Sequence, residues 1–296
     1  MKVCLLHQIL GSAYEMFKNA GHEIVSDPVG ADAVMSLLTD KIDGDFMDKV
    51  GPQLKIIANY AVGFDNIDIA EAKKRNIYVT NTPGGFEKSV AEHAVALMFC
   101  VGRKIIPADK FVRAGEYERW DPNIFIGMEF FGKTIGIIGM GRIGSAMAKI
   151  CQDGLGMKVI SSSREPGSLE NLLKEADVVS LHVPLTPETR HLITSKELSL
   201  MKKTAILINT ARGAIVDEIA LAKALSEKWI LGAGLDVFED ETRIVTDSER
   251  ILYGLDNVVL TPHIASATIT ARDEMSRLAA QNIINALSGK TPQNSV

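Results

Sequence analysis

The sequence has little of what marks the special classes of protein. Its 296 residues include three cysteines, and no apolar run approaches the roughly 20 residues that a membrane-spanning helix needs. Cys4, Cys100 and Cys151 lie in apolar surroundings without metal-ligand spacing, so we expect buried free thiols and no metal site. The net charge of -5 comes with no basic stripe or polybasic tail, which gives no support to nucleic acid or a membrane as a partner.

What the sequence does contain is typical of a soluble globular protein. Hydrophobic residues make up 46% of the chain and charged residues 23%, which excludes the disordered and fibrous classes. The opening residues, MKVCLLHQ, predict a buried strand rather than a signal peptide. We therefore expect a cytoplasmic protein that is long enough for two domains.

Both parts of the chain alternate short apolar runs with amphipathic stretches, as a parallel sheet covered by helices on both faces does. The strands expected in the first part are 3–7, 23–25, 33–38, 54–60 and 78–81. Those expected in the second part are 134–138, 158–161, 178–182, 205–209, 232–237 and 258–260. A helical stretch from 89 to 103, interrupted at Pro107 and resumed to 114, connects the two parts. For the last amphipathic stretch, 268–287, we expect a return to the first domain.

One segment of the second part, GKTIGIIGMGRIG at 132–144, has the glycine spacing of a nucleotide-binding turn. An apolar run ends at Gly139, Gly141 and Gly144, and a helical pattern follows. In such a motif the first glycine makes the turn, the second lets a pyrophosphate approach the backbone, and the third lets the helix lie close to the strand. Glycines also close ordinary turns, but the flanking strand and helix favour a dinucleotide whose phosphates lie at the helix N-terminus.

Polar clusters follow three later strands, at the edge where open α/β sheets bind ligands. Arg212 follows 205–209 in NTARG, where its guanidinium could grip a carboxylate or form only a surface salt bridge. Acidic residues follow the next strand in GLDVFEDE, and His263 follows the strand after that. A row of carboxylates is more often a solvated loop, but one beside this imidazole would favour its protonated form and fix its orientation.

Two further features are less specific. NYAVGFDNID, at 59–68, places a glycine-bearing turn after a strand, and its amides could hold an anion or simply connect strand to helix. The other histidines fit core or surface positions, although His182 also falls at a strand end: they are His7, His22, His93, His182 and His191.

These motifs, in this order, resemble the D-isomer-specific 2-hydroxyacid dehydrogenase family over nearly the whole chain. The segments that carry the resemblance are NYAVGFDNID, TNTPG, GKTIGIIGMGRIG, LHVPLTPETRHLI, INTARG, GLDVFEDE and TPHIASAT. The resemblance implies two doubly wound parallel-sheet α/β domains. A Rossmann nucleotide-binding domain (101–267) would be inserted in a flavodoxin-like substrate domain (1–100 and 268–296). It also implies a homodimer.

The resemblance further implies a catalytic set of Arg212, Glu241 and His263. Arg212 would bind the substrate carboxylate and polarise the keto group, and His263 would donate the proton as hydride leaves the nicotinamide. Glu241 is selected over Glu239 because it stands five residues after Asp236, the spacing of the family.

Substrate and cofactor contacts are implied in the same way. The backbone of Val62 and Gly63 would hold the substrate carboxylate. The residues implied at the cofactor are Gly139, Gly141, Arg142, Ile143, Gly144, Ser162, Ser163, Arg164, His182, Pro184, Thr189, Thr210, Ala211 and Asp236.

Two departures from the family bear on these expectations. Thr242 stands where the family commonly has proline, which leaves the geometry of the following loop open. An NAD enzyme normally has an acidic residue about 20 positions beyond the glycines, for the ribose 2′-OH; here Ser162, Ser163 and Arg164 occupy that region. Hydroxyls and a guanidinium suit a 2′-phosphate, although Glu165 could pair with Arg164 or take the acidic role itself. We predict a preference for NADP(H), with NAD(H) possible.

The leading hypothesis is a reductase of small 2-keto acids. Glyoxylate and hydroxypyruvate are favoured because NADP-preferring members of the family often act on them. A different class stays open, since corepressor proteins of the same fold use dinucleotide binding to control assembly. The chain lacks the long tails expected of such proteins, but only turnover separates the two. Phosphite or formate oxidation is a third option, which the sequence does not favour.

Overall fold

The computed structural model describes residues 1–84, 86–163, 165–241 and 251–296, and the chain divides into two compact units. Unit 1 comprises Met1–Phe86 and Ala267–Val296, and unit 2 comprises Glu87–Ser266. The first division lies ahead of the expected boundary at 100, because helix α4 (Glu87–Gly102) packs along its length against unit 2.

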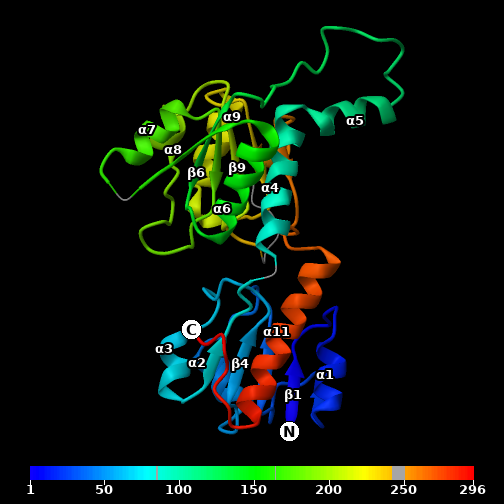
Figure 1. The fold of residues 1–296 in the computed structure, drawn as a ribbon, viewed down its shortest axis with the longest axis vertical. Helices are drawn as coiled ribbons and strands as arrows, with labels where there is room; N and C mark the ends of the chain where they lie inside the picture. Colours follow the sequence, from blue (N-terminus) through cyan, green and yellow to red (C-terminus); the bar gives the residue numbers. More distant parts are fainter. Residues whose placement is uncertain (85, 164, 242–250) are drawn as a thin grey trace. The chain divides into compact units, whose positions relative to one another are not determined.

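Unit 1 contains a five-stranded parallel sheet in the order β2-β1-β3-β4-β5. Its strands are β1 (Lys2–Leu5), β2 (Glu23–Val25), β3 (Ala33–Ser36), β4 (Ile56–Asn59) and β5 (Tyr78–Thr80). Helices α1 (Ala13–Asn19) and α11 (Ile269–Leu287) cover one face, and α2 (Gly44–Val50) and α3 (Ile69–Lys74) cover the other (Figure 1). Because both faces are covered, every residue of β3 and β4 is buried.

The last helix of the chain, α11, belongs to unit 1 and packs against α1 and β4. Polar contacts help to fix it there. Ser276 accepts a hydrogen bond from the amide of Ala13 at 3.0 Å, and the Tyr60 hydroxyl donates to the carbonyl of Arg272 at 2.7 Å.

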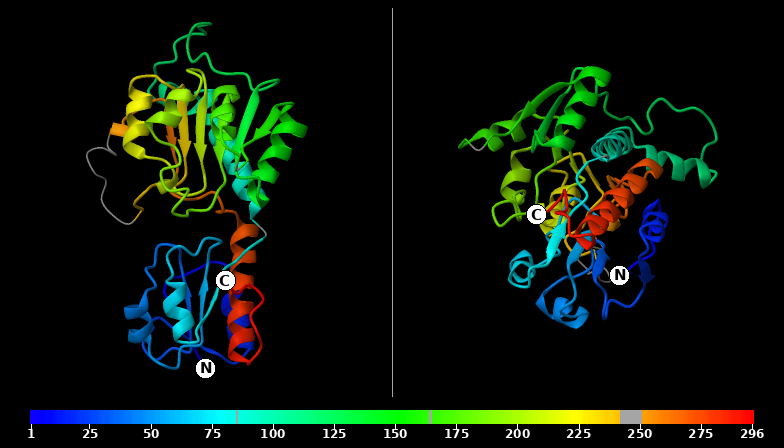
Figure 2. Two further views of the ribbon diagram at one scale, coloured as in Figure 1. Left: turned by 90° about the vertical axis from the view of Figure 1, so that its left-hand side faces the viewer. Right: turned by 60° about the horizontal axis from the view of Figure 1, so that its bottom comes forward.

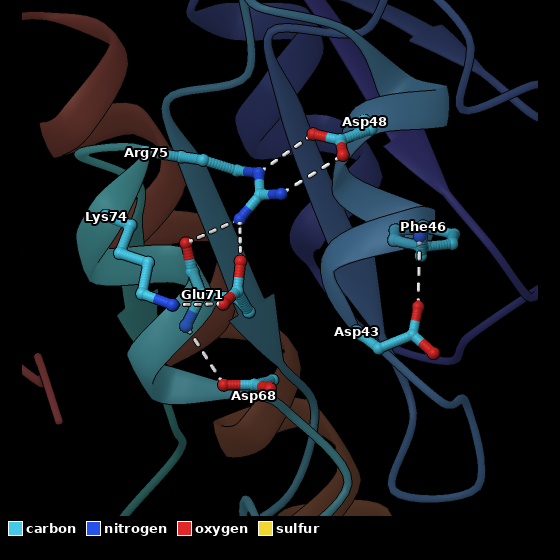
Figure 3. A network of polar contacts seen from close by, with 7 residues as sticks. All are labelled: Asp43, Phe46, Asp48, Asp68, Glu71, Lys74 and Arg75. Carbon is cyan, nitrogen blue, oxygen red and sulfur yellow. Dashed lines mark hydrogen bonds and ion pairs between the residues drawn. The ribbon is translucent and has the colours of Figure 1, made fainter.

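A polar network connects α2 with α3 on unit 1 (Figure 3). Arg75 donates through Nε and Nη2 to both carboxylate oxygens of Asp48, at 2.8 and 3.0 Å, and through Nη1 to Glu71. Asp43 and Asp68 cap the two helices by accepting from backbone amides at 3.0 and 2.9 Å. Bidentate arginine–carboxylate pairs fix geometry as well as charge, so this network sets how the two helices lie together.

Unit 2 contains a six-stranded parallel sheet in the order β11-β10-β9-β8-β6-β7. The strands are β6 (Thr134–Ile138), β7 (Lys158–Ser161), β8 (Val178–Leu181), β9 (Ile206–Asn209), β10 (Gly232–Leu235) and β11 (Val258–Leu260). Helices α4 and α6 (Arg142–Lys149) pack together on one face of the sheet, and α7 (Ser168–Glu175), α8 (Ser195–Leu200) and α9 (Glu218–Ser226) cover the other (Figure 2).

Strand β6 is the point at which the winding of unit 2 reverses. It pairs with β7 on one side and with β8 on the other, all in parallel. In open α/β sheets, ligands bind beyond the carboxyl ends of the strands at such a switch point. The glycine turn, which begins at Gly139, follows the carboxyl end of β6.

The helical stretch between the two parts of the chain breaks at Lys104, not at Pro107 as the sequence suggested. Lys104 has a positive φ of 53°, and α5 (Ile105–Arg113) begins directly after it. Pro107 falls in the first turn of α5, where a helix does not need the amide that proline lacks. None of the residues of α5 is buried, and α5 and the segment after it extend away from the sheet of unit 2 (Figures 1 and 2).

The three cysteines are free; Cys4 and Cys151 are buried as expected, and Cys100 is half-buried. Burial raises the pKa of Cys4 to about 11 and that of Cys151 to about 12. Within the described ranges, no helix is long and apolar enough to cross a membrane, and no three His, Cys, Asp or Glu side chains cluster as metal ligands would.

Candidate active site

The glycine-rich segment folds as strand, turn and helix. Gly139 has a φ of 102°, and a Cβ there would lie 2.5 Å from the carbonyl oxygen of His182. A Cβ on Gly144 would lie 2.0 Å from the carbonyl oxygen of Gly139. A Cβ on Gly141, by contrast, would meet no described atom within 4 Å. The fold itself therefore requires the first and third glycines, whereas the second borders open space, as a pyrophosphate lying against the backbone needs.

The N-terminus of α6 presents donors beside this open space. The first hydrogen bond of the helix runs from the amide of Ser145 to the carbonyl of Gly141, at 2.9 Å. The amides of Arg142, Ile143 and Gly144 come earlier and so have no carbonyl partner within the helix. These donors and the positive end of the helix dipole suit a phosphate, so the glycine turn fits a dinucleotide.

The segment after β7 is a compact polar loop next to the glycine turn. The amide of Ser163 donates to Oγ of Ser168 at 2.8 Å, and Oγ of Ser163 accepts from the amide of Glu165 at 3.2 Å. The amide of Ser162 lies 3.4 Å from the carbonyl of Ile137 in β6. The loop therefore carries serines, and no carboxylate, at positions 162 and 163; Arg164 lies outside the described residues.

The loop after β8 holds three further expected cofactor residues: His182, Pro184 and Thr189. The amide of His182 donates to the carbonyl of Ile138 at 2.8 Å, which keeps the loop beside the glycine turn. Burial lowers the pKa of His182 to about 4, so its ring is neutral near pH 7. Thr189 Oγ1 donates to the carbonyl of Pro184 and accepts from the amide of Thr186, both at 2.7 Å. Both of these hydrogen bonds of the Thr189 hydroxyl therefore lie within the loop itself.

The NTARG turn after β9 is shaped by Asn209, which donates to the carbonyl of Arg212 at 2.9 Å and accepts from the amide of Ala211 at 3.0 Å. Nη1 of Arg212 donates to the carbonyl of Ala211 at 2.8 Å. Thr210 is buried, and its hydroxyl has no hydrogen-bond partner among the described residues. A cofactor is one group that could supply that partner.

The turn of Arg212 packs against the acidic segment that follows β10. A Cβ on Gly213 would lie 1.8 Å from the carbonyl carbon of Phe238 and 2.2 Å from the amide nitrogen of Glu239. Two backbone segments can approach this closely only where one has no side chain. Gly213 therefore sets the spacing between the turn of Arg212 and the acidic segment.

Within the acidic segment, Glu241 and Glu239 point to different partners. Oε2 of Glu241 lies 2.8 Å from Nδ1 of His263, and the side chains of the imidazole and the acid are 24% and 19% exposed. Glu239 instead contacts Arg190 at 3.1 Å and His191 at 3.0 Å. The structure thus brings Glu241, and not Glu239, to His263.

Asp236 anchors the segment that carries His263. Its carboxylate is fully buried and accepts from the Thr261 hydroxyl at 2.6 Å and from the amides of Ile264 and Ala265 at 2.9 and 2.8 Å. Its carbonyl accepts from the amide of His263 at 2.8 Å. Burial raises the pKa of the Asp236 carboxyl, but these hydrogen bonds and one from a histidine outweigh burial and hold the pKa below its usual range.

That histidine is His93, for which the sequence indicated only a core or surface position. It lies on α4, with Nε2 3.0 Å from Oγ1 of Thr261 and 3.3 Å from Oδ1 of Asp236. The sequence around His93 did not indicate this contact, because the contact depends on how α4 packs against β10 and β11.

In unit 1, the turn after β4 presents amides. Asn59 Nδ2 donates to the carbonyl of Gly63 at 2.7 Å, and Asn81 Nδ2 donates to the carbonyl of Val62 at 2.8 Å. Within the described part of the chain, the amides of Val62 and Gly63 have no acceptor. The asparagine side chains therefore fix the carbonyls of Val62 and Gly63, and the backbone amides of the same two residues can donate to an anion.

Similarity to known proteins agrees with this arrangement. Residues 95–265 match the family model described as D-isomer specific 2-hydroxyacid dehydrogenase, NAD binding domain. The chain belongs to the D-isomer-specific 2-hydroxyacid dehydrogenase family. This family member is 52% identical over 281 residues to a glyoxylate reductase of Thermococcus litoralis, with 90% of the chain and 83% of the relative covered. It is 50% identical over 282 residues to a glyoxylate reductase of Aeropyrum pernix, with the same coverage.

Solved structures of similar proteins share the fold. A protein of Thermus thermophilus has a TM-score of 0.93 and 39% identity, with 100% of both chains covered. An NADPH-dependent glyoxylate/hydroxypyruvate reductase of Sinorhizobium meliloti, in complex with NADP and malonate, has a TM-score of 0.85 and 28% identity, with 100% of this chain and 96% of that one covered. The predicted class of two parallel-sheet α/β domains in this dehydrogenase family is confirmed.

Proposed function

We propose that this family member uses NADPH to reduce glyoxylate or hydroxypyruvate to the corresponding 2-hydroxy acid. The observation that carries the proposal is the 2.8 Å hydrogen bond between Glu241 and His263, beside the packed turn of Arg212. Sequence identity of 52% and 50% to glyoxylate reductases supports the substrate class.

His263 is the proton donor in this proposal. Nδ1 of the ring contacts Glu241, which leaves Nε2 as the atom that gives its proton to the keto oxygen. Glu241 orients the ring through this contact with Nδ1. Bound NADPH supplies the hydride to the carbonyl carbon.

Besides the keto oxygen, the proposed site binds the carboxylate of the substrate. Arg212 binds it and polarises the neighbouring keto group, since a guanidinium matches the geometry of a carboxylate. The amides of Val62 and Gly63, whose carbonyls are held by asparagines, also donate to the carboxylate.

The cofactor contacts follow the folded loops of unit 2. The amides of Arg142, Ile143 and Gly144, above the open side of Gly141, hold the pyrophosphate. The further contacts that we propose on the cofactor are Gly139, His182, Pro184, Thr189, Thr210, Ala211 and Asp236. Of these, Thr210 has a buried hydroxyl that still needs a partner.

The preference for NADPH is assigned to the segment after β7. Ser162, Ser163 and Arg164 bind the 2′-phosphate, because no carboxylate at 162 or 163 repels it. The test is the ratio of kcat/KM for NADPH to kcat/KM for NADH, and a clear preference for NADH contradicts the proposal. Arg164→Asp should move the ratio towards NADH, whereas an unchanged ratio shows that Arg164 does not contact the phosphate.

Turnover itself is tested by following cofactor oxidation at 340 nm across a panel of 2-keto acids with NADPH and NADH. We expect glyoxylate and hydroxypyruvate to be reduced. Purified protein that binds NADPH but oxidises it with no member of the panel would support the alternative, a dinucleotide-binding regulatory protein of the corepressor type.

We also propose that the protein is a cytoplasmic homodimer. Apolar side chains on α5 and the segment after it are exposed, and a second copy of the chain is the proposed cover: they are Ile105, Ile106, Val112, Tyr117, Trp120 and Ile126. Light scattering on purified protein should give twice the chain mass of 32.1 kDa. A monomer at micromolar concentration contradicts this assembly.

A further inference from the structure

We infer that His93 is a positioning residue for the proposed reduction. From α4 it holds the Asp236 carboxylate and the Thr261 hydroxyl, and through them the segment that places His263. The inference rests on the proposed function, and it concerns a residue outside the proposed catalytic set of Arg212, Glu241 and His263.

The hydrogen positions in this cluster follow from its donors and acceptors. The Thr261 hydroxyl has one hydrogen, and it donates that hydrogen to Asp236 Oδ1 at 2.6 Å. Asp236 is ionised and can only accept. His93 Nε2 faces both oxygens, at 3.0 and 3.3 Å, so it must carry a hydrogen and donate. The ring of His93 is therefore fixed as a donor at Nε2.

The hydrogen-bond donors to the Asp236 carboxylate come from two different parts of the chain. The Thr261 hydroxyl and the amides of Ile264 and Ala265 bind Asp236 from the segment that carries His263. Among the described contacts of this carboxylate, His93 alone comes from a helix. Through this contact, His93 connects the segment that carries His263 to α4, which packs on β10 and β11.

The backbone conformation of His263 explains why this segment must be held in place by contacts such as that of His93. His263 has a φ of 54°, a left-handed conformation that costs free energy in a residue with a side chain and persists only where the surroundings enforce it. The same residue must keep Nδ1 2.8 Å from Glu241. A shift of the segment by a fraction of an ångström would misdirect Nε2, and misplacement by about 1 Å can cost about 100-fold in rate.

The first test compares two substitutions at His93. His93→Leu removes the donor at similar volume, whereas His93→Gln places an amide NH₂ near the position of Nε2. We expect His93→Leu to lower kcat about 10-fold to 100-fold, with little change in KM for NADPH. We expect His93→Gln to retain most of the activity. Equal activities of the two variants, whether both high or both low, overturn the inference, as does a change confined to melting temperature.

His22→Leu is the matched control. It makes the same chemical change at a half-buried histidine of unit 1, next to β2. We expect kcat to stay at the wild-type value. A fall in kcat as large as that of His93→Leu would mean that the loss of any half-buried histidine slows the enzyme, and would overturn the specific role of His93.

The second test uses the wild-type protein and needs no turnover. In protein labelled with 15N-histidine, the resonance of His93 should show a proton on Nε2, identified by its absence in His93→Gln. An unprotonated Nε2 near neutral pH overturns the inference. If the wild type reduces no 2-keto acid, the proposed function fails, whereas the protonation of Nε2 still decides the role assigned to this hydrogen bond.

Discussion

Glu241 Oε2 and His263 Nδ1 lie 2.8 Å apart, although the two residues follow different strands. β10 and β11 pair in parallel, so the segments after them leave the sheet at the same edge. Asp236, directly after β10, then binds the segment after β11 through both its carboxylate and its carbonyl. The acid and the imidazole are thus held together from both strands.

Glu241→Gln should slow reduction while leaving NADPH binding intact. Glutamine keeps an oxygen that can accept from Nδ1 but loses the charge that strengthens the hydrogen bond orienting the ring, so we expect a fall in kcat of about 10-fold to 100-fold. Glu239→Gln is the control, because Glu239 contacts Arg190 and His191 instead. Equal effects of the two substitutions would contradict the assignment.

Alanine should weaken NADPH binding at position 141 and lower the stability of the protein at position 144. Gly141→Ala meets no described atom, so the melting temperature should hold while Kd for NADPH rises at least about tenfold, or 1.4 kcal/mol. Gly144→Ala places a Cβ 2.0 Å from a carbonyl oxygen, and overpacking of this kind costs about 1–3 kcal/mol of stability. Thermal unfolding and fluorescence titration measure both. Wild-type NADPH affinity in Gly141→Ala would argue against a pyrophosphate at this turn.

His182 should make the stability of the protein depend on pH in the acidic range. Burial lowers its pKa to about 4, below the value near 6.5 of an exposed histidine in the unfolded chain. Between these values the unfolded chain binds more protons, so the free energy of unfolding falls as pH is lowered from about 6.5 to 4. We expect this group to account for about 1–3 kcal/mol of that fall.

Urea unfolding at pH 7 and pH 4.5 tests this dependence against His182→Gln. Glutamine cannot titrate, and it can keep a hydrogen bond near the 2.9 Å contact between His182 Nε2 and Ser180. The wild type should lose more stability than the variant on acidification. Equal losses would show that protonation of His182 does not contribute.

Local sequence patterns predicted much of this molecule. Parallel strands covered on both faces need continuous apolar runs, and those runs marked all eleven strands of the two sheets in the described ranges. The spacing of glycines at 139, 141 and 144 predicted the turn, because Gly139 and Gly144 have steric requirements that follow from their places in the motif and Gly141 leaves open the space that a pyrophosphate needs. The choice of Glu241 over Glu239 came from resemblance to a family, and local chemistry alone left it open.

Features that depend on packing between distant segments were not predictable. The contact of His93 with Asp236 and Thr261 requires α4 to lie on the sheet of unit 2, and the pattern within α4 does not reveal that partner. Pro107 suggested a helix break, but its position in the first turn of α5 accommodates it and the break falls at Lys104. The hydrogen bonds of the Thr189 hydroxyl within its own loop were likewise not predicted, and its contact with the cofactor stays a proposal.

A single-turnover experiment tests the central claim most directly. Protein in excess over NADPH is mixed with glyoxylate, and absorbance at 340 nm is followed for the wild type and for His263→Asn. We predict complete oxidation of NADPH by the wild type, and a rate about 100-fold to 10,000-fold lower in the variant, because it retains cofactor binding but lacks the proton donor. Wild-type protein that binds NADPH yet leaves it unoxidised, or a variant as fast as the wild type, would contradict the account.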